Sequence, residues 1–353
     1  MKKVAIIGTV GVPAVYGGFE TMVDNIIGDN ASCGVQYTIF CSSQSYSTQL
    51  PSYRGAQLKY IPLKANGVQS IAYDVWSLLR VVGGYDVVVA LGVSGGLFFP
   101  LFKLLSRSRL IVNIDGLEWR RAKWGRVARR FLRLSERLAV GWADVVVADN
   151  RAIVEYVAKG YRRSAVMIAY GGDHVLCEGV AEDDILAGYG VARGEYAMSL
   201  CRVEPENNCE MILRSAAYTG AILLFVGNWS RSKYGRELKR RYSKYPNIKI
   251  IEALYQRETL YALRHCCRCY IHGHSAGGTN PSLVEAMFCG CNIIAYDVVY
   301  NRETTENRAA YFIDSESLSA LLGSSISNQA EMQQIAQRRY RWRTIAKEYE
   351  SLY

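Results

Sequence analysis

The chain has 353 residues, half of them hydrophobic and 21% charged, which excludes a disordered or collagen-like protein. At about 150 residues per domain, this length favours two domains. The formal charge of +10 favours an anionic partner, such as a nucleotide, phospholipid headgroups or nucleic acid.

Short β-branched apolar runs alternate with longer amphipathic stretches, as is typical of a parallel α/β sheet. The first half of the chain predicts helices over 18–29, 69–82, 95–105, 120–140 and 150–160. It predicts strands over 3–7, 35–41, 57–61, 86–91, 109–114, 144–148 and 165–169. The alternation breaks at Tyr170-Gly171-Gly172-Asp173.

After an acidic stretch over 178–194, a second series begins. Its predicted strands cover 196–201, 221–226, 248–252, 267–271, 292–296 and 309–313. Its predicted helices cover 207–218, 232–244, 256–264, 281–289 and 315–325, and the tail 329–353 adds one or two more. We therefore expect two doubly wound domains. Because open parallel sheets bind ligands beyond the carboxyl ends of their strands, a site in a cleft between the domains is expected.

The first strand runs into a long glycine-containing loop that ends in Gly17-Gly18 at a helix N-terminus. The loop has neither the spacing of a dinucleotide-binding glycine motif nor a G-K-[ST] sequence. Free backbone N–H groups at that helix start can hold a phosphate, and glycine lets the ligand approach. The alternative is a simple flexible turn.

Four segments carry a resemblance to a known family. They are GVPAVYGGFET at 11–21, DGLEWR at 115–120, RVEPENN at 202–208 and GGTNPSLVEAM at 277–287. Together they resemble retaining GT-B glycosyltransferases of the family 4 type, and in particular bacterial rhamnosyltransferases of capsule and exopolysaccharide synthesis. The resemblance implies two Rossmann-like domains facing a cleft, with a C-terminal helix that crosses back. We expect an acceptor domain over 1–175, completed by a tail helix over 335–353, and a nucleotide-sugar domain over 176–334.

The resemblance also implies roles for single residues. Glu285 matches the second glutamate of an E-x7-E motif, which holds the donor's ribose hydroxyls, while the first glutamate falls at Gly277. Arg202 matches the arginine that binds the donor diphosphate. Asn207 stands where the family usually has a lysine.

The residues themselves agree with a donor site around 278–285. Pro281 suits the first turn of a helix, whose free N–H groups would point at a diphosphate. Glu285 lies one turn beyond Ser282 on the same helix face and can accept hydroxyls, or it can be a glutamate that the helix dipole stabilises. Arg202 follows an apolar strand directly and suits bidentate phosphate binding, or an ion pair with Glu204 or Glu206. The expected donor-binding residues are Gly17, Gly18, Arg202, Asn207, His274, Gly278, Thr279, Asn280, Ser282, Leu283 and Glu285.

Acceptor and catalytic roles are expected from carboxylates of the first domain. Asp115 ends a strand and could act on a sugar hydroxyl, or it could cap a helix. Glu20 and Glu118 are the other expected acceptor-binding residues. With Arg202 and Glu285, Asp115 completes the expected catalytic set.

The cysteines do not predict a metal centre. Cys266, Cys267 and Cys269 lack the paired spacing of zinc ligands and suit a buried strand. No D-x-D tract suggests a metal-bridged diphosphate, so we expect neither metal nor cofactor. Nucleic-acid binding by the basic, aromatic tail is possible, but a domain-crossing helix is the favoured interpretation.

The segment from Trp119 to Arg137 has eight basic residues and one acid. Trp124, Val127, Phe131, Leu134 and Leu138 recur at helical spacing as an apolar stripe. Such helices lie in membrane interfaces, although the stripe could also pack on the sheet while the arginines meet headgroups. We expect membrane contact through Trp119, Trp124, Arg126, Arg129, Arg130 and Arg133.

The combined prediction is a retaining transferase that moves a hexose, with L-rhamnose from dTDP-L-rhamnose expected, to a lipid-linked saccharide. No apolar run reaches the ~18 residues of a membrane span, so we expect a cytoplasmic protein, peripheral at the inner face of the cell membrane. A UDP-hexose transferase of the same fold and a non-catalytic nucleotide or nucleic-acid binding protein are the alternatives.

Overall fold

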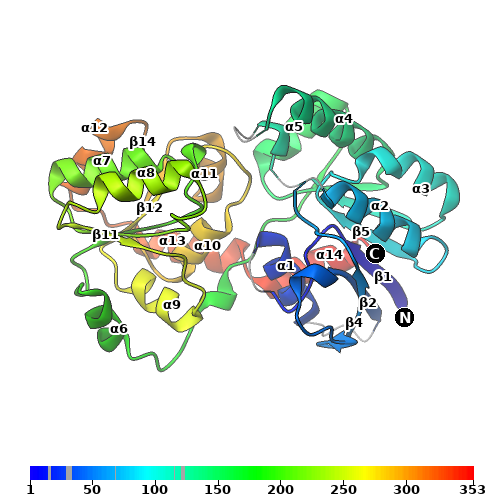
Figure 1. The fold of residues 1–353 in the computed structure, drawn as a ribbon, viewed down its shortest axis with the longest axis horizontal. Coiled ribbons are helices and arrows are strands. Elements are labelled where there is room, and N and C mark those ends of the chain that lie inside the picture. The colour runs from blue at the N-terminus through cyan, green and yellow to red at the C-terminus, as the bar shows by residue number, and fades with distance from the viewer. Residues whose placement is uncertain (15–16, 29–33, 68, 115, 121–123) are drawn as a thin grey trace. The chain divides into compact units, whose positions relative to one another are not determined.

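A computed structural model describes residues 1–14, 17–28, 34–67, 69–114, 116–120 and 124–353. It divides into two compact units (Figure 1). Unit 1 consists of Met1–Tyr170 and Trp342–Tyr353, and unit 2 consists of Gly171–Arg341. Each unit has a largely parallel sheet flanked by helices, so the expected two-domain α/β architecture is confirmed.

The sheet of unit 1 has the strand order β3-β4-β2-β1-β5-β6-β7-β8, and only the pair β3–β4 is antiparallel. Its central strands are runs of valine, isoleucine and leucine that are buried on both faces, as parallel strands covered by helices require. The strands are β1 (Lys2–Ile7), β2 (Val35–Ser42), β3 (Ser52–Tyr53), β4 (Ala56–Ile61), β5 (Val87–Leu91), β6 (Arg109–Asn113), β7 (Val145–Ala148) and β8 (Val166–Met167).

Helices cover both faces of this sheet. α1 packs against α14, whereas the crossovers through α2, α3 and α4 run in the opposite direction along the sheet and so lie on the other face. The helices are α1 (Gly18–Gly28), α2 (Gln69–Val81), α3 (Phe99–Leu105), α4 (Arg126–Trp142), α5 (Arg151–Tyr161) and α14 (Trp342–Ser351). Short 3-10 helices are η1 (Ser43–Ser45), η2 (Gly96–Phe98) and η3 (Glu118–Arg120).

The sheet of unit 2 has the order β11-β10-β9-β12-β13-β14 and is parallel throughout. Its strands are β9 (Ala197–Leu200), β10 (Leu223–Val226), β11 (Ile248–Ile251), β12 (Cys269–His272), β13 (Ile293–Tyr296) and β14 (Ala310–Phe312). The helices are η4 (Asp173–Val175), α6 (Glu182–Tyr189), η5 (Pro205–Asn207), α7 (Cys209–Thr219), α8 (Lys233–Tyr242), α9 (Arg257–His265), α10 (Pro281–Phe288), α11 (Val299–Thr304), α12 (Ser315–Leu322) and α13 (Gln329–Arg339). None of the described helices has both the length and the hydropathy that a membrane span needs.

The tail forms two helices, which is one of the outcomes expected over 329–353, and the helix expected over 335–353 is divided between them. The two helices belong to different units, and the chain is anchored between them at Tyr340. The Tyr340 hydroxyl donates to the Thr304 carbonyl oxygen at 2.9 Å, and the Gly172 N–H donates to the Tyr340 carbonyl oxygen at 2.9 Å. The unit boundaries therefore fall after Tyr170 and Arg341 rather than after residues 175 and 334.

The second tail helix, α14, completes the core of unit 1. Trp342, Ile345 and Tyr349 are buried there with residues of β1, β2 and α1. The Tyr349 hydroxyl accepts a hydrogen bond from the Asn113 amide at 2.7 Å. The expected return of a C-terminal helix to the N-terminal domain is thus seen in α14.

Candidate functional site

The strand order of unit 2 reverses at β9, which has β10 on one side and β12 on the other. Ligands of open parallel sheets bind beyond the carboxyl ends of the strands at such a reversal. Arg202 lies just after β9, and the segment 273–280 leads from β12 into α10. This edge of unit 2 is the candidate donor site.

The two loops at this edge are hydrogen-bonded to each other. The Asn208 amide donates to the Gly273 carbonyl oxygen at 2.8 Å, and the N–H and hydroxyl of Ser275 donate to the Glu206 carbonyl oxygen at 2.9 and 2.8 Å. A Cβ on Gly273 would lie 2.3 Å from the Asn207 carbonyl oxygen, so this approach requires glycine. These contacts were not predicted, because side-chain amides that bond to a distant backbone leave no periodic signal.

Arg202 and Asn207 have different roles in the first loop. Asn207 is buried, and its amide donates to the Arg202 carbonyl oxygen at 2.7 Å, so it shapes the loop instead of facing a donor. Its expected role as a direct donor contact is therefore not supported. Arg202 is half-buried and pairs with neither Glu204 nor Glu206 in unit 2, where every residue is described. Among the residues of unit 2, its guanidinium thus has no carboxylate partner.

Gly277 occupies the place of the missing glutamate for a conformational reason. Its φ is +134°, a backbone conformation that side-chain-bearing residues rarely adopt, although a Cβ there would meet open space. A glutamate at this position would strain the loop. The neighbouring Gly278 and Thr279 are buried.

The start of α10 is closed by its own cap. The Asn280 side-chain oxygen accepts from the Ser282 N–H at 3.2 Å and from its hydroxyl at 3.0 Å. The Leu283 N–H donates to the Asn280 carbonyl oxygen at 3.1 Å, and the Leu283 side chain is fully buried. The expected donor contacts of Ser282 and Leu283 are therefore not supported, because the cap and the core use these groups. Asn280 acts as the N-cap that orders the loop.

Glu285 is held by two partners from other elements, of which Arg264 is buried and His174 is partly exposed. The Arg264 guanidinium of α9, which is 2% exposed, lies 2.5 Å from Glu285 Oε2, and His174 Nε2 of η4 lies 3.6 Å from Oε1. Burial acts to lower the pKa of Arg264, but the facing Glu285 carboxylate, together with the nearby Cys289, Tyr270 and Cys291, raises it overall. Burial lowers the pKa of His174. Arg264 therefore fixes one carboxylate oxygen of Glu285 and leaves Oε1 toward His174.

Two histidines stack at the end of β12. Their rings are 4.3 Å apart and nearly parallel. His272 is fully buried, burial lowers its pKa to about 3, and neither ring nitrogen has a hydrogen-bond partner within unit 2. His274 is buried beside it, and its carbonyl oxygen accepts from the Asn301 amide at 2.9 Å. His272 is a neutral imidazole with unused polar atoms at the candidate donor site.

In unit 1, the glycine loop is organised by Glu20. Its carboxylate accepts from the Thr9 hydroxyl at 2.9 Å and from the Val10 N–H at 2.7 Å, and it is buried. Gly17 has φ +124°, and a Cβ there would lie 1.9 Å from Glu20 Oε2. The expected acceptor role of Glu20 is thus not supported, because the carboxylate bonds to its own loop. Gly18 begins α1 and is exposed.

Asp74 of α2 is a titratable residue that the sequence analysis missed. It is buried beside the loops that follow β1 and β5, and it accepts a hydrogen bond from the Ser94 hydroxyl. Gly8, Gly92 and Gly95 lie around it and leave no room for a water molecule. Burial raises its pKa to about 7, although the hydrogen bonds from Ser94 and Gly95 oppose this. No motif marked it, because its burial arises from tertiary contacts.

The remaining expected residues lie near η3 and α4. Asp115 falls outside the described residues. The Trp124 indole donates to Glu118 Oε1 at 3.1 Å, and the Arg133 guanidinium lies 5.2 Å from the Trp119 ring. The expected membrane arginines on α4 are all exposed: Arg126, Arg129, Arg130 and Arg133.

The apolar stripe of this helix does not form its buried face. The side chains that α4 buries are Leu132, Ser135, Glu136, Ala139 and Val140, whereas Val127 and Leu134 of the stripe are exposed. The buried side of α4 is partly polar, because it includes Ser135 and Glu136. These two residues form hydrogen bonds with Val93 and Tyr156.

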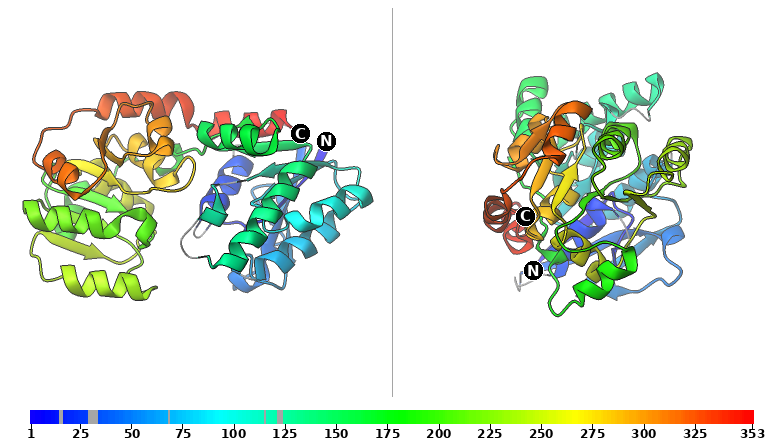
Figure 2. Two further views of the ribbon diagram at one scale, coloured as in Figure 1. Left: turned by 90° about the horizontal axis from the view of Figure 1, so that it is seen from above. Right: turned by 90° about the vertical axis from the view of Figure 1, so that its left-hand side faces the viewer.

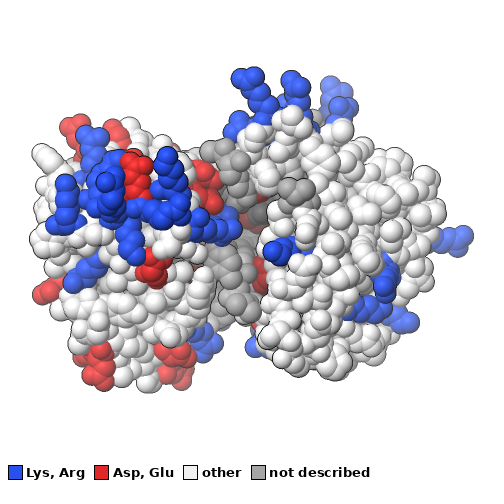
Figure 3. All heavy atoms as spheres, viewed as in Figure 1, with Lys and Arg blue, Asp and Glu red and all other residues white. Residues whose placement is uncertain are grey.

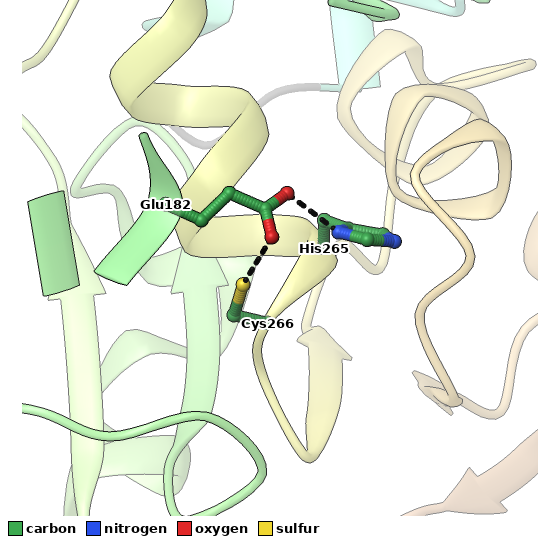
Figure 4. Close-up of side chains that lie close together, drawn as sticks. All are labelled: Glu182, His265 and Cys266. Carbon is green, nitrogen blue, oxygen red and sulfur yellow. Dashed lines mark hydrogen bonds and ion pairs between the residues drawn. The ribbon is translucent and has the colours of Figure 1, made fainter. Parts of the chain in front are cut away.

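One cluster in unit 2 has the composition of a metal site. Glu182, His265 and Cys266 come together where α6 meets α9 (Figure 4). However, the carboxylate already accepts from His265 Nδ1 at 2.7 Å, from the Cys266 thiol at 3.4 Å and from Arg193 at 2.5 Å. Burial raises the pKa of Cys266 to about 12, so the thiol stays protonated. The Arg193 guanidinium thus takes up the carboxylate, and the Cys266 sulfur keeps its proton, so neither group is available to a metal ion.

Comparison with known families separates the two halves of the chain. Residues 1–173 match a domain of unknown function, DUF1972, and residues 191–342 match the glycosyl transferases group 1 domain. No curated protein matches the chain. The candidate donor site lies within the second match.

Solved structures resemble the whole chain at low sequence identity. A sucrose-phosphate synthase from Thermosynechococcus elongatus is 16% identical with a TM-score of 0.80, covering 100% of this chain and 98% of its own. HepE from Anabaena in complex with UDP-glucose is 16% identical with a TM-score of 0.77, covering 100% and 99%. Starch synthase IV from Arabidopsis thaliana is 12% identical with a TM-score of 0.69, covering 99% and 98%. The chain therefore has the fold of these GT-B structures, and its second half is a glycosyl transferases group 1 domain that contains the Arg202–Glu285 edge.

Proposed function

We propose that the protein is a retaining glycosyltransferase that transfers a hexose to a lipid-linked saccharide in bacterial surface polysaccharide synthesis. The donor that we assign is dTDP-L-rhamnose, on the basis of the motifs at 11–21, 115–120, 202–208 and 277–287. The observation that carries the proposal is that Arg202 and Glu285 lie at the same edge of unit 2. Arg202 has no carboxylate partner there, and Arg264 holds Glu285 in place.

The proposed chemistry relies on charge stabilisation at the donor diphosphate. An arginine offers two parallel N–H donors to phosphate oxygens and keeps its charge. As the bond to the sugar breaks, negative charge grows on the leaving diphosphate, where preorganised donors are most effective. In the front-side attack that we propose, this diphosphate accepts the proton of the acceptor hydroxyl. The scheme needs neither metal nor cofactor.

Glu285 is proposed to hold the ribose of the donor through Oε1. Its other oxygen is bonded to Arg264, and His174 Nε2 lies 3.6 Å from Oε1. The buried, unpartnered His272 is proposed to donate a hydrogen bond to the bound sugar or phosphates. The 2′-deoxyribose of a dTDP donor has one hydroxyl fewer than the ribose of a UDP donor. The surroundings of Oε1 therefore bear on which of the two nucleotides binds.

A UDP-hexose donor is the second candidate. HepE, which has the same fold, was solved in complex with UDP-glucose, and a carboxylate oxygen can accept from a ribose with two hydroxyls as well as from one with a single hydroxyl.

We propose a peripheral position on the cytoplasmic face of the membrane, since a lipid-linked acceptor resides there.

The test is transfer and donor hydrolysis with dTDP-L-rhamnose and UDP-glucose, followed by NMR assignment of the anomeric configuration of the product. We expect turnover of the dTDP-sugar with retained configuration. Release of an inverted product would overturn the retaining assignment, and turnover of UDP-glucose alone would overturn the donor. A protein that binds nucleotide but never releases sugar would be a binding module instead.

A further inference from the structure

One face of unit 1 exposes a concentration of large apolar side chains. We call it the leucine face and define it by exposed side chains of η2, α3 and α4. Among these, Leu104 is 76% exposed, Val127 is 82% exposed and Leu134 is 50% exposed. No helix of unit 2, which is described throughout, exposes more than one large hydrophobic side chain. The members of the face are Leu97, Leu101, Leu104, Leu105, Val127, Leu134 and Trp142.

The two helices make this face continuous. α4 packs on η2 and α3, and Figures 1 and 2 show α3 and α4 side by side. The Ser135 hydroxyl donates to the Val93 carbonyl oxygen at 2.5 Å, so this side of α4 faces the start of η2. Leu134 precedes Ser135 by one helical position, and Val127 lies two turns earlier on the same side as Leu134. The apolar stripe of α4 therefore adjoins the side of this helix that packs on η2 and α3.

Positive charge lines the opposite border of this stripe. Around the helix axis, Arg133 and Ser135 lie on opposite sides of Leu134. α4 exposes five arginines in all. The one carboxylate of α4, Glu136, is buried and accepts from the hydroxyls of Tyr156 at 2.7 Å and Tyr161 at 2.5 Å. Basic side chains project from this edge of unit 1 in Figure 3. The exposed arginines are Arg126, Arg129, Arg130, Arg133 and Arg137.

We infer that the leucine face and the arginines of α4 dock on the surface of an anionic lipid bilayer. Leucine and valine side chains can enter the boundary between headgroups and acyl chains, while the arginines remain at the lipid phosphates. A nucleic acid would use the arginines but would leave the leucines in water. A symmetric dimer through α4 would bring its arginines close to those of the partner. An anionic lipid surface is the partner that accounts for both the exposed apolar side chains and the arginines.

This inference rests on the proposed function only for the reason why the protein would bind a membrane, which is access to a lipid-linked acceptor. The docking itself is tested without any sugar, by co-sedimentation of the full chain with phosphatidylcholine vesicles that contain or lack phosphatidylglycerol. We expect binding to the anionic vesicles that weakens as salt is added. No binding by the wild type would overturn the inference.

A charge-reversal pair tests the basic border. Arg126→Glu with Arg130→Glu is expected to weaken binding by at least about tenfold, because each cation near an anionic surface contributes about 1 kcal/mol. The matched control is Arg236→Glu with Arg240→Glu on α8, which changes the net charge equally at exposed positions of unit 2. Equal loss in both variants would mean that net charge alone drives binding, and would overturn the assignment of this face.

A second pair tests the apolar contribution. Leu101→Ser with Leu104→Ser should reduce vesicle binding at all salt concentrations, whereas the exposed control pair Val299→Ser with Ile313→Ser should not. Calorimetric titration of the nucleotide-sugar into each variant measures donor binding separately from vesicle binding. A failure of donor binding in every variant, wild type included, would sink the proposed donor while leaving the docking result intact. A wild type that forms dimers in sedimentation velocity and ignores vesicles would assign the face to a second copy.

Discussion

At the residue scale, the arrangement around Glu285 makes Arg264 a positioning residue. The guanidinium is fully buried against the carboxylate, and breaking such a pair leaves an uncompensated charge. Arg264 lies 21 positions before Glu285 in the chain, so no local motif joins them. The sequence could nominate Glu285 by resemblance, but it could not show what holds the side chain.

We predict that Glu285→Ala will weaken nucleotide-sugar affinity by roughly 10- to 150-fold, because a hydrogen bond to a charged group contributes ~1.5–3 kcal/mol. Arg264→Met should also weaken it, although Arg264 touches no donor in this scheme, because Glu285 loses its fixed orientation. Calorimetric titration measures both. Arg268→Met is the matched control, because Arg268 lies between α9 and β12 and its guanidinium donates to the Leu322 carbonyl oxygen at 2.9 Å. Unchanged affinity in the folded Arg264→Met protein would remove its positioning role.

Asp74 predicts a pH dependence of stability in unit 1. Its pKa is about 7 in the folded protein against an ordinary value of 3.8. The stability that comes from the protonated carboxyl is fully present below about pH 4 and is lost as pH rises through 7, at up to about 1.4 kcal/mol per pH unit.

The variant Asp74→Asn should flatten this dependence, since an amide can accept the Ser94 hydroxyl without titrating. Denaturant unfolding at several pH values between 4 and 8 measures it, with hydrogen exchange to assign the change to unit 1. Parallel curves for the wild type and the variant across that range would show that Asp74 does not carry the effect.

At the element scale, the sequence predicted most of the regular structure because the hydrophobic periods are strong. The strands expected over 3–7 and 109–114, for example, are β1 and β6 within a residue or so. α6 and α11 were missed, since the first begins with three acids in the acidic stretch over 178–194 and the second has only six residues. The exposed stripe of α4 could not be predicted, because the side of α4 that the structure buries contains Ser135 and Glu136 and is less apolar than the stripe.

The capped start of α10 gives an element-scale prediction. Asn280→Ala removes the acceptor of two hydrogen bonds, which costs about 1 kcal/mol of stability. It should also weaken donor affinity, because the loop 277–280 loses its order. Asn328 offers a control elsewhere in unit 2, since its side chain accepts from the Ile293 N–H at 2.8 Å away from the donor edge. Asn328→Ala should lower the melting temperature without changing donor affinity. Loss of affinity in both variants would indicate general destabilisation instead.

At the scale of the whole molecule, the tail helix ties the end of the chain to its beginning. α14 buries Trp342, Ile345 and Tyr349 in the core of unit 1, and burying each large apolar side chain contributes about 1.5–3 kcal/mol. The resemblance anticipated a returning helix, but the break at Tyr340 depends on hydrogen bonds to Thr304 and Gly172 that the sequence does not display.

Deletion of residues 342–353 should therefore unfold or loosen unit 1 while unit 2 keeps its protection. Hydrogen exchange followed by mass spectrometry resolves the two units. Tyr349→Phe is a mild control that removes only the hydrogen bond to Asn113 and should leave both units protected. Equal loss of protection in both units after the deletion would contradict the division of the chain into these units.

The central claim is that a nucleotide-sugar binds at the carboxyl edge of unit 2 through the charge and geometry of Arg202. Calorimetric titration of dTDP-L-rhamnose into the wild type, Arg202→Lys and the exposed control Arg214→Lys tests it most directly. We predict that Arg202→Lys loses at least about tenfold in affinity, because an ammonium cannot bond two phosphate oxygens as a planar guanidinium does, while Arg214→Lys binds like the wild type. Equal affinity in all three proteins would contradict the account.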